Sequence, residues 1–401
     1  MLYTRGVNHS RRSALCAGAT LLGACLASSP SILAASSGVP PRPARQPNLD
    51  DFINLSDFET LAERRLSARA RAMVQGGAAD EHTLRWNREA FNQVRLRPHI
   101  LTDVSHIDTR VSLFGCDLPH PILLAPTAFH GMIHPRGELE TVEGASAAKA
   151  LLVVSSASNT RIQPIADRAS GPLWFQMYVQ SDRGFVTDVV REVEAAGSKA
   201  LVVTVDAPVV GVRYRQMRVR FRLDKGLKLP YMYDVNRGRD SLLRGGNSRM
   251  TWDDLEWLRS ITQLPILLKG VMHPDDAEKA VAAGVSGLVV SNHGGRSLDT
   301  APSTLSALPG VVDRVQGRIP ILMDGGIRRG TDILKALAFG ARAVLIGRPY
   351  LHGLAVGGAS GIARVTAILR DELEQAMALT GCTRLDTLDR GVLWEETAVR
   401  P

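Results

Sequence analysis

The sequence predicts an α/β protein built as an eight-stranded (β/α)8 barrel of the TIM type, with a helical extension in front of it. Three observations favour this fold. Short apolar runs recur from about residue 120 onward, segments of helical periodicity separate most of them, and these helical segments end at glycines. Strands that alternate with helices pair in parallel, and eight such units favour a closed barrel. An open doubly wound sheet is the alternative, but no G-x-G-x-x-G motif follows the first strand.

The first fifty residues differ in composition from the rest of the chain. The motif SRRSAL carries a twin arginine, and the small, weakly apolar run that follows it is typical of an export signal. We expect residues 1–35 to form this signal and residues 36–50 a flexible tether. Cys25 ends the lipobox-like motif LGAC, so acylation of Cys25 is the alternative to simple cleavage. Both alternatives predict a periplasmic protein, and the second makes it a membrane-tethered lipoprotein.

Composition excludes several classes of function for the remainder. The chain has 401 residues, 45% hydrophobic and 22% charged, which is ordinary for a globular protein. Its net charge of +8 is not accompanied by a zinc-finger, RRM or helix-turn-helix motif, so we expect no nucleic-acid partner. The body contains two cysteines, Cys116 and Cys382, whose separation predicts neither a disulfide nor a metal site.

The elements follow in order along the body. Residues 51–120 are expected to form the helical extension, because DFETLAERRLSARARAMV and EHTLRWNREAF have helical periodicity and Gly76-Gly77 separates them. Residues 121–390 are expected to form the barrel. Its eight predicted strands are Pro121–Ala125, Leu151–Ser155, Leu173–Val179, Ala200–Val205, Pro265–Leu268, Leu288–Val290, Pro320–Met323 and Ala343–Ile346.

Every one of these strands ends in polar or glycine-rich residues, and in such barrels the carboxyl ends of the strands carry the active site. We therefore expect one shared site at this rim. The endings are Thr127-Ala128, Ser155, Gln176 with Tyr178, Thr204 with Asp206, Lys269, Ser291 to His293, Asp324-Gly325-Gly326 and Gly347-Arg348.

The residue types at these endings indicate a chemistry. DGGIRRG and IGRP follow the last two strands, where backbone N–H groups, Arg328 and Arg348 can bind a phosphate. Lys269 can place a positive charge beside an electron-rich ring. His293 is a candidate general base, with Asp206 able to stabilise its imidazolium.

Two arginines are candidate ligands of a substrate carboxylate. Arg296 follows His293 by three residues, and Arg213 opens a basic segment, residues 213–249, with eleven Arg or Lys against three Asp. This segment is either a solvated lid or a docking surface for an acidic electron-transfer protein or anionic lipid.

Together these motifs resemble the FMN-dependent L-2-hydroxy acid oxidases and dehydrogenases, a family that includes glycolate and lactate oxidases and mandelate dehydrogenase. The resemblance runs from about Asp57 to about Leu388, and SNHGGR followed by DGGIRRG is its most specific part. It implies FMN as the cofactor, a small 2-hydroxy acid as the substrate, and a homotetramer. Oxygen, a quinone or a cytochrome would reoxidise the flavin.

The resemblance also implies residue roles. His293 would be the base, Asp206 its partner, Arg213 and Arg296 the carboxylate ligands, and Tyr178 a contact to the substrate hydroxyl. Lys269 would lie by the flavin N1–C2 edge, and the electrons would leave either as a hydride or through a carbanion. The ring and ribityl chain would contact Thr127, Ala128, Ser155, Gln176, Thr204 and Ser291, and the phosphate end Asp324, Gly325, Gly326, Arg328, Gly347 and Arg348.

Two positions depart from the family pattern. Met73 stands where family members usually carry a carboxylate-binding Tyr, and Ala157 stands where many have Trp or Tyr. Loss of a hydrogen bond to a charged group costs ~1.5–3 kcal/mol, so we expect weaker binding of small acids and space for a bulkier one. A non-catalytic flavin-binding envelope protein is the further alternative, against which the intact His293, Asp206 and Arg296 argue.

Overall fold

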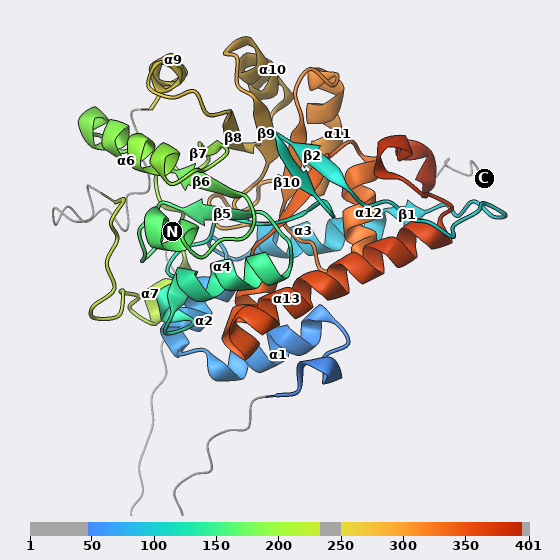
Figure 1. The fold of residues 1–401 in the computed structure, drawn as a ribbon, viewed down its shortest axis with the longest axis horizontal. Helices are drawn as coiled ribbons and strands as arrows, with labels where there is room; N and C mark the ends of the chain where they lie inside the picture. The colour runs from blue at the N-terminus through green and yellow to red at the C-terminus, as the bar shows by residue number, and fades with distance from the viewer. Residues whose placement is uncertain (1–46, 233–249, 395–401) are drawn as a thin grey trace, which may run out of the picture. The chain divides into compact units, whose positions relative to one another are not determined.

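A computed structural model describes residues 47–232 and 250–394. The predicted signal, residues 36–46 of the predicted tether and residues 233–249 of the basic segment lie outside the described residues. The last residues of the predicted tether are described, and a short 3-10 helix, Leu49–Asp51, begins there. Eight parallel strands close into a barrel in the order β4–β5–β6–β7–β8–β9–β10–β11, with β11 pairing back onto β4 (Figure 1). The predicted closed barrel is confirmed, and the open sheet is wrong.

The barrel strands agree closely with the predicted runs. Each consists of buried residues along nearly its whole length, as expected where both faces of a parallel sheet are covered. Their bounds are β4 Ile122–Leu124, β5 Leu152–Ser155, β6 Leu173–Met177, β7 Leu201–Thr204, β8 Ile266–Val271, β9 Gly287–Val290, β10 Ile321–Asp324 and β11 Ala343–Ile346.

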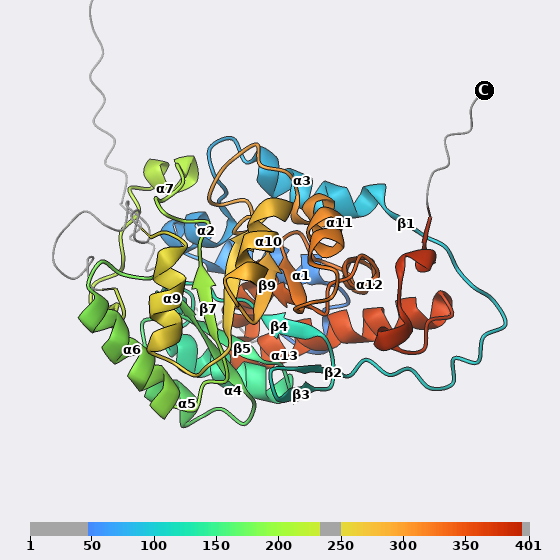
Figure 2. The same cartoon turned by 90° about the horizontal axis from the view of Figure 1, so that it is seen from above.

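Helices follow the strands around the barrel (Figure 2). Several end at left-handed glycines, among them Gly197, Gly284 and Gly340, as the sequence predicted. Their bounds are α4 Gly137–Ala147, α5 Ile162–Ala166, α6 Arg183–Ala195, α7 Tyr214–Arg218, α9 Asp253–Ser260, α10 Pro274–Ala282, α11 Thr304–Val315, α12 Gly330–Ala338 and α13 Arg348–Leu379. Among the described helices none combines the length and apolar character needed to cross a membrane.

Residues 51–120 are helical in their first part alone. Three helices occupy it, α1 Leu55–Arg65, α2 Ala68–Gln75 and α3 His82–Gln93, and we call them the N-terminal helices. The later part is extended and contains β1 Arg95–Leu96, β2 Val111–Leu113 and β3 Cys116–Leu118, so the helical part of this segment ends at Gln93. β1 pairs with β12 Leu393–Trp394, which carries the folded body past residue 390.

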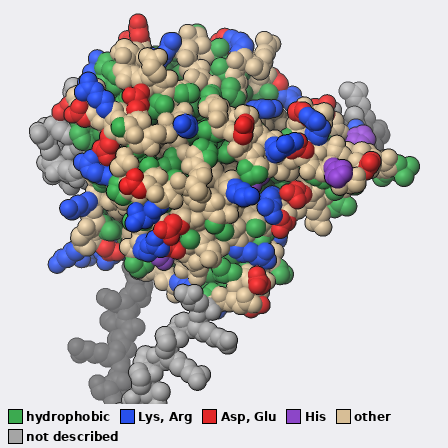
Figure 3. All heavy atoms as spheres, viewed as in Figure 1, with side chains coloured by type: hydrophobic (Ala, Val, Ile, Leu, Met, Phe, Trp, Pro, Cys, Tyr) green, Lys and Arg blue, Asp and Glu red, His purple; other side chains and the backbone are tan. Residues whose placement is uncertain are grey.

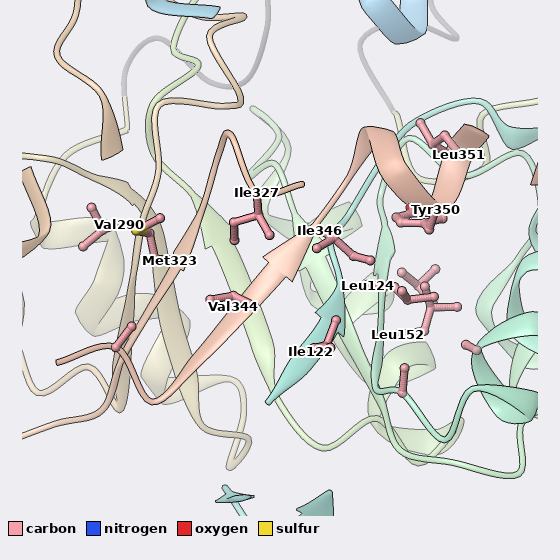
Figure 4. Close-up of a cluster of buried hydrophobic side chains, with 14 of the residues drawn as sticks. Ile122, Leu124, Leu152, Val290, Met323, Ile327, Val344, Ile346, Tyr350 and Leu351 are labelled. Carbon is pink, nitrogen blue, oxygen red and sulfur yellow. The ribbon is translucent and has the colours of Figure 1, made fainter. Parts of the chain in front are cut away.

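Alternate strand residues face opposite sides of the barrel wall. One set, which includes Ile122, Leu124, Leu152, Val344 and Ile346, packs against the surrounding helices (Figure 4). In the close-up, Tyr350 and Leu351 of α13 lie beside these side chains. This layer fixes α13 against the carboxyl half of the barrel wall.

The other set forms a separate cluster with the hairpin β2–β3. Leu123, Val153, Val202 and Leu322 belong to it, together with Cys116 of the hairpin. Phe114 at the hairpin turn packs edge-on against Trp174, with ring centroids 5.6 Å apart. The hairpin therefore closes the amino end of the barrel, and the polar strand endings lie at the opposite end.

Candidate active site

Three side chains from three strand endings meet at the carboxyl end of the barrel. Tyr178 follows β6, Asp206 follows β7 and His293 follows β9. The Nδ1 atom of His293 lies 3.0 Å from Oδ1 of Asp206, and its Nε2 atom lies 3.3 Å from the hydroxyl of Tyr178. Because Asp206 is bonded to Nδ1, Nε2 is the nitrogen that faces Tyr178.

The environment sets the charge of this group. Burial lowers the pKa of His293, and the carboxylate of Asp206 opposes that shift. Burial would raise the pKa of Asp206, but the imidazole of His293 and the ammonium of Lys269 hold it below its ordinary value. At neutral pH the pair therefore consists of a neutral imidazole and a carboxylate, which is the state a general base requires.

A pH dependence follows from these shifts. A base whose pKa lies below its ordinary 6.5 stays neutral through the physiological range, so the acid limb of flavin reduction is expected below pH 6.5. Asp206→Asn removes the group that raises the pKa of His293, so the limb should move to still lower pH. The reduction rate should fall roughly tenfold to a hundredfold, because the imidazolium loses its charged partner. Stopped-flow reduction across pH measures both; a limb that moves upward would contradict the assignment.

A buried charged chain links three neighbouring strands below this triad. Lys269 Nζ donates to Ser291 Oγ at 2.8 Å and lies 2.9 Å from Oδ2 of Asp324, while Ser291 Oγ donates to Oδ1 of Asp324 at 2.7 Å. Burial would lower the pKa of Lys269, but Asp324 and Asp206 raise it. Lys269 therefore stays protonated, and its ammonium is held in place by Ser291 and Asp324.

The structure places Lys269 and Asp324 inside their strands, whereas the sequence prediction ended both strands one residue earlier. β8 continues to Val271 because Gly270, with φ +115°, forms a bulge in its pairing with β9. A Cβ at Gly270 would lie 2.5 Å from Cβ of Asp206. The bulge therefore lets Asp206 approach the strand that carries Lys269.

The wall next to Lys269 offers polar edges to a planar ring. Thr204 lies directly opposite Lys269 in the strand register. Ser155 Oγ donates to Oε1 of Gln176 at 2.8 Å, and Nε2 of Gln176 is buried with no hydrogen-bond partner among the described residues. An unused amide donor on β6 and a buried cation two strands away on β8 fit the carbonyl and ring-nitrogen edge of a flavin. These residues therefore fit FMN.

The last two strand endings supply positive charge for a phosphate. Arg328 and Arg348 are both partly buried, and burial lowers the pKa of Arg328 to about 10 and that of Arg348 to about 9. Nε of Arg328 has no hydrogen-bond partner among the described residues, and Glu59 lies 3.8 Å away. Because burial disfavours the charged form of both guanidiniums, a bound anion would stabilise them. Gly325 and Gly326 lie beside them with φ +100° and +82°.

Arg348 also has contacts that the sequence did not predict. Its guanidinium donates to the backbone carbonyls of Val74, Gly76 and Gly294 at 2.9–3.0 Å. It thereby joins α13 to the N-terminal helices and to the loop that carries His293. Gly347, which precedes it, leaves an added Cβ 3.7 Å from Cγ2 of Thr127, so these two strand endings lie side by side.

The two predicted carboxylate ligands lie close to each other. Arg213 Nε donates to the carbonyl of Arg296 at 3.3 Å. Nη1 of Arg296 donates to the carbonyls of Met73 and Gly76, both at 2.7 Å. Burial lowers the pKa of each guanidinium, and the charges of Arg213 and Arg348 lower the pKa of Arg296 further. The pair is thus a second group of partly buried positive charges, close enough to Tyr178 to act on it electrostatically.

Thr127 and Ala128, at the first strand ending, lie over a polar network that the sequence did not reveal. The hydroxyl of Thr127 is bonded to Nε2 of His130 at 2.7 Å and, closely, to the hydroxyl of Tyr350. Nδ1 of His130 is bonded to the hydroxyl of Thr141 at 2.9 Å. No spacing in the sequence indicates these partners, because Tyr350 comes from the helix after the last strand.

The two departures from the family pattern are both buried. Met73, in α2, is 4% exposed, and Ala157, just after β5, is 6% exposed. The carbonyl of Met73 contacts Arg296, which places this residue at the site. The Ala157 N–H donates to Ser155, so Ala157 lies beside the predicted ring edge.

Comparison with known proteins assigns the chain to a family. The sequence model of the FMN-dependent dehydrogenases matches residues 62–395. The chain is 43% identical to a 2-hydroxyacid oxidase of Dictyostelium discoideum, over 87% of this chain and 92% of that protein. It is 46% identical to an L-lactate oxidase of Nostoc, over 85% of this chain and 98% of that protein.

Solved structures of the same family have the same fold as this chain. A soluble form of the membrane-associated (S)-mandelate dehydrogenase of Pseudomonas putida has a TM-score of 0.81 at 35% identity, covering 86% of this chain and all of that one (100%). A mandelate oxidase variant with (S)-mandelic acid has a TM-score of 0.79 at 36% identity, covering 84% and 97%. The chain belongs to the FMN-dependent dehydrogenase family and is an oxidoreductase whose cofactor is FMN.

Proposed function

We propose that this enzyme oxidises an L-2-hydroxy acid to the corresponding 2-oxo acid and that oxygen reoxidises the flavin, giving hydrogen peroxide. The observation that carries the proposal is the placement of His293 between Asp206 and Tyr178, at 3.0 and 3.3 Å. The relatives named 2-hydroxyacid oxidase and L-lactate oxidase support the substrate class.

Each residue of the site has a distinct role in the proposed reaction. Nε2 of His293 takes a proton from the substrate, and Asp206 stabilises the imidazolium that results. Arg296 has one terminal nitrogen engaged by backbone carbonyls, so its other nitrogens and Arg213 bind the carboxylate. Tyr178 donates to the substrate oxygen. Lys269 stabilises negative charge on the reduced cofactor, and FMN accepts the two electrons.

The proposal is tested by anaerobic mixing of the purified FMN-bound protein with a panel of 2-hydroxy acids. Flavin absorbance should be lost with the L-enantiomers and retained with the D-enantiomers. Air should then restore the absorbance with one equivalent of peroxide. Flavin that remains oxidised with every acid would contradict the proposed function and favour a non-catalytic flavin-binding role.

Met73 and Ala157 support a bulkier substrate than lactate or glycolate. A small side chain at Ala157 leaves room where an aromatic ring would stand, and Met73 supplies no hydroxyl to a carboxylate. Ala157→Trp should therefore raise KM for long or aromatic 2-hydroxy acids more than for lactate. Met73→Tyr should lower KM for all of them by roughly tenfold or more, through one added charged hydrogen bond. Steady-state kinetics over the panel checks both, and a parent enzyme that strongly prefers glycolate would contradict the proposal.

A quinone or a cytochrome is the alternative acceptor. The relative named mandelate dehydrogenase is described as membrane-associated, and the described part of the basic segment, residues 213–232, is rich in arginine and lysine. Charged side chains of both signs are interspersed on the face shown in Figure 3. Anaerobic reoxidation by a quinone analogue faster than reoxidation by air would favour this alternative over oxygen.

We further propose that the protein is exported. The twin-arginine motif and the apolar run after it support a cleaved signal in residues 1–35, with acylation at Cys25 as the lipoprotein alternative. The twin-arginine route carries folded proteins, which suits an enzyme that binds its cofactor before export. The family resemblance supports a homotetramer. Mass spectrometry of the mature N-terminus distinguishes cleavage from acylation.

A further inference from the structure

The loop that carries His293 has an unusual backbone. His293, Gly294 and Gly295 all have left-handed conformations, with φ of 59°, 64° and 74°. Glycine adopts this region freely, but for a residue with a Cβ the left-handed helical conformation costs roughly 1–2 kcal/mol. Three left-handed residues in succession therefore need neighbouring groups that hold them.

Part of the support comes from the barrel itself. The His293 N–H donates to Ser291 Oγ at 3.1 Å, and the Gly295 N–H donates to the carbonyl and to the side-chain oxygen of Asn292, both at 3.0 Å. The turn thus folds back onto Asn292. The orientation of the Asn292 side chain determines where the turn closes.

Asn87 of α3 fixes that side chain. Its Nδ2 donates to Oδ1 of Asn292 at 2.8 Å, and Nδ2 of Asn292 donates back to its Oδ1, also at 2.8 Å. Both residues are buried, with exposed fractions of 2% and 5%. Oδ1 of Asn87 also accepts from the Thr304 N–H at 3.2 Å. The side-chain amide of Asn87 therefore makes three hydrogen bonds, two of them with Asn292.

Other atoms of α3 and of the loop between α2 and α3 lie against the same turn. The Ala78 N–H donates to the carbonyl of Gly295 at 2.8 Å. A Cβ at Gly295 would lie 2.7 Å from the backbone of Leu84 in α3, so the turn leaves no space there for a side chain. The start of α3 and the residues just before it are therefore in direct backbone contact with the turn.

We propose that Asn87 is a positioning residue for the reaction: through Asn292 it holds the left-handed turn that places His293 against Asp206 and Tyr178. The neutral amide can donate to and accept from Asn292 at once, which neither a carboxylate nor an apolar side chain of the same shape can do. This inference rests on the proposed role of His293 as the base. Asn87 acts through the loop and does not itself touch the reacting atoms.

The test compares Asn87→Leu and Asn87→Ser with Thr83→Val in the FMN-bound enzyme. Thr83 is a matched control, because it is buried on the same helix and its hydroxyl donates to the carbonyl of Ala301 at 2.8 Å, outside the turn. Asn87→Leu removes all three hydrogen bonds of the Asn87 side chain, and Asn87→Ser leaves room for a bridging water. Flavin reduction at saturating substrate, KM, FMN content and thermal unfolding are measured for each, with His293→Gln alongside.

The rate constant for flavin reduction should fall roughly tenfold to a hundredfold in Asn87→Leu, since misplacement of a reacting group by about 1 Å costs that much. It should fall less in Asn87→Ser, and KM should change less than the rate. A rate in Asn87→Leu within twofold of that in Thr83→Val, or a fall that merely parallels the loss of thermal stability in all three variants, would overturn the inference. A normal rate in His293→Gln would instead overturn the proposed function.

Discussion

Replacement of His293 by glutamine is expected to lower the rate constant for anaerobic flavin reduction by roughly 10²–10⁴-fold while FMN stays bound. The imidazole holds its Nδ1 at 3.0 Å from Asp206 and presents Nε2 toward Tyr178. A glutamine amide can occupy part of this space, but it cannot accept a proton at neutral pH. Stopped-flow spectroscopy with an excess of substrate measures the rate constant directly.

A second buried imidazole provides the control for this substitution. His120 is 1% exposed, and its Nε2 is bonded to the carbonyl of Ala148 at 3.0 Å. His120→Gln removes a buried imidazole from the region before β4, outside the site, so it should lower stability while leaving the reduction rate near that of the parent. Equal losses of rate in the two variants would show that His293 acts through stability and not as the base.

Lys269→Met is expected to destabilise the protein by on the order of 3–5 kcal/mol and to weaken FMN binding, because it leaves Asp324 as a buried carboxylate without its cation. The ammonium lies 2.9 Å from Asp324 and donates to Ser291, and all three groups are buried. Urea unfolding followed by far-ultraviolet circular dichroism gives the change in the free energy of unfolding, and titration of the apoprotein with FMN gives the affinity.

The double variant Lys269→Met/Asp324→Asn separates stability from chemistry. Neutralising both partners removes the unpaired buried charge, so much of the lost stability should return. The rate of flavin reduction should remain low, because no cation then lies beside the reduced cofactor. If the free energy of unfolding of Lys269→Met lies within about 1 kcal/mol of that of the parent, the Lys269–Asp324 pair does not stabilise the fold as its burial indicates.

The barrel was predictable because its signal is local. Each strand is a short buried run, and each strand ending lies within a few residues of it, so position along the chain alone places Tyr178, Asp206, Lys269 and His293 at one rim. The first half of the extension was predictable for the same reason, since α1 and α2 show helical periodicity and end near Ser67 and Gly76.

The contacts that organise the site were not predictable from the sequence. Asn87 and Asn292 are 205 positions apart, and the pairing depends on how α3 packs against the barrel. The left-handed conformation of His293 and the bulge at Gly270 are equally invisible, because a histidine or a glycine in a turn is compatible with many backbone geometries. Tertiary packing, and not local propensity, determines these features.

The hairpin β2–β3 has a consequence for the order in which ligands associate. Phe114 and Cys116 cover the amino end of the barrel, and the alternate strand side chains fill the space above them. FMN and the acid would therefore both enter from the carboxyl end of the barrel, where the polar strand endings lie, and FMN would bind before the acid. A bound acid or inhibitor would then block the exit of FMN, so the rate of FMN dissociation should fall when either one is present.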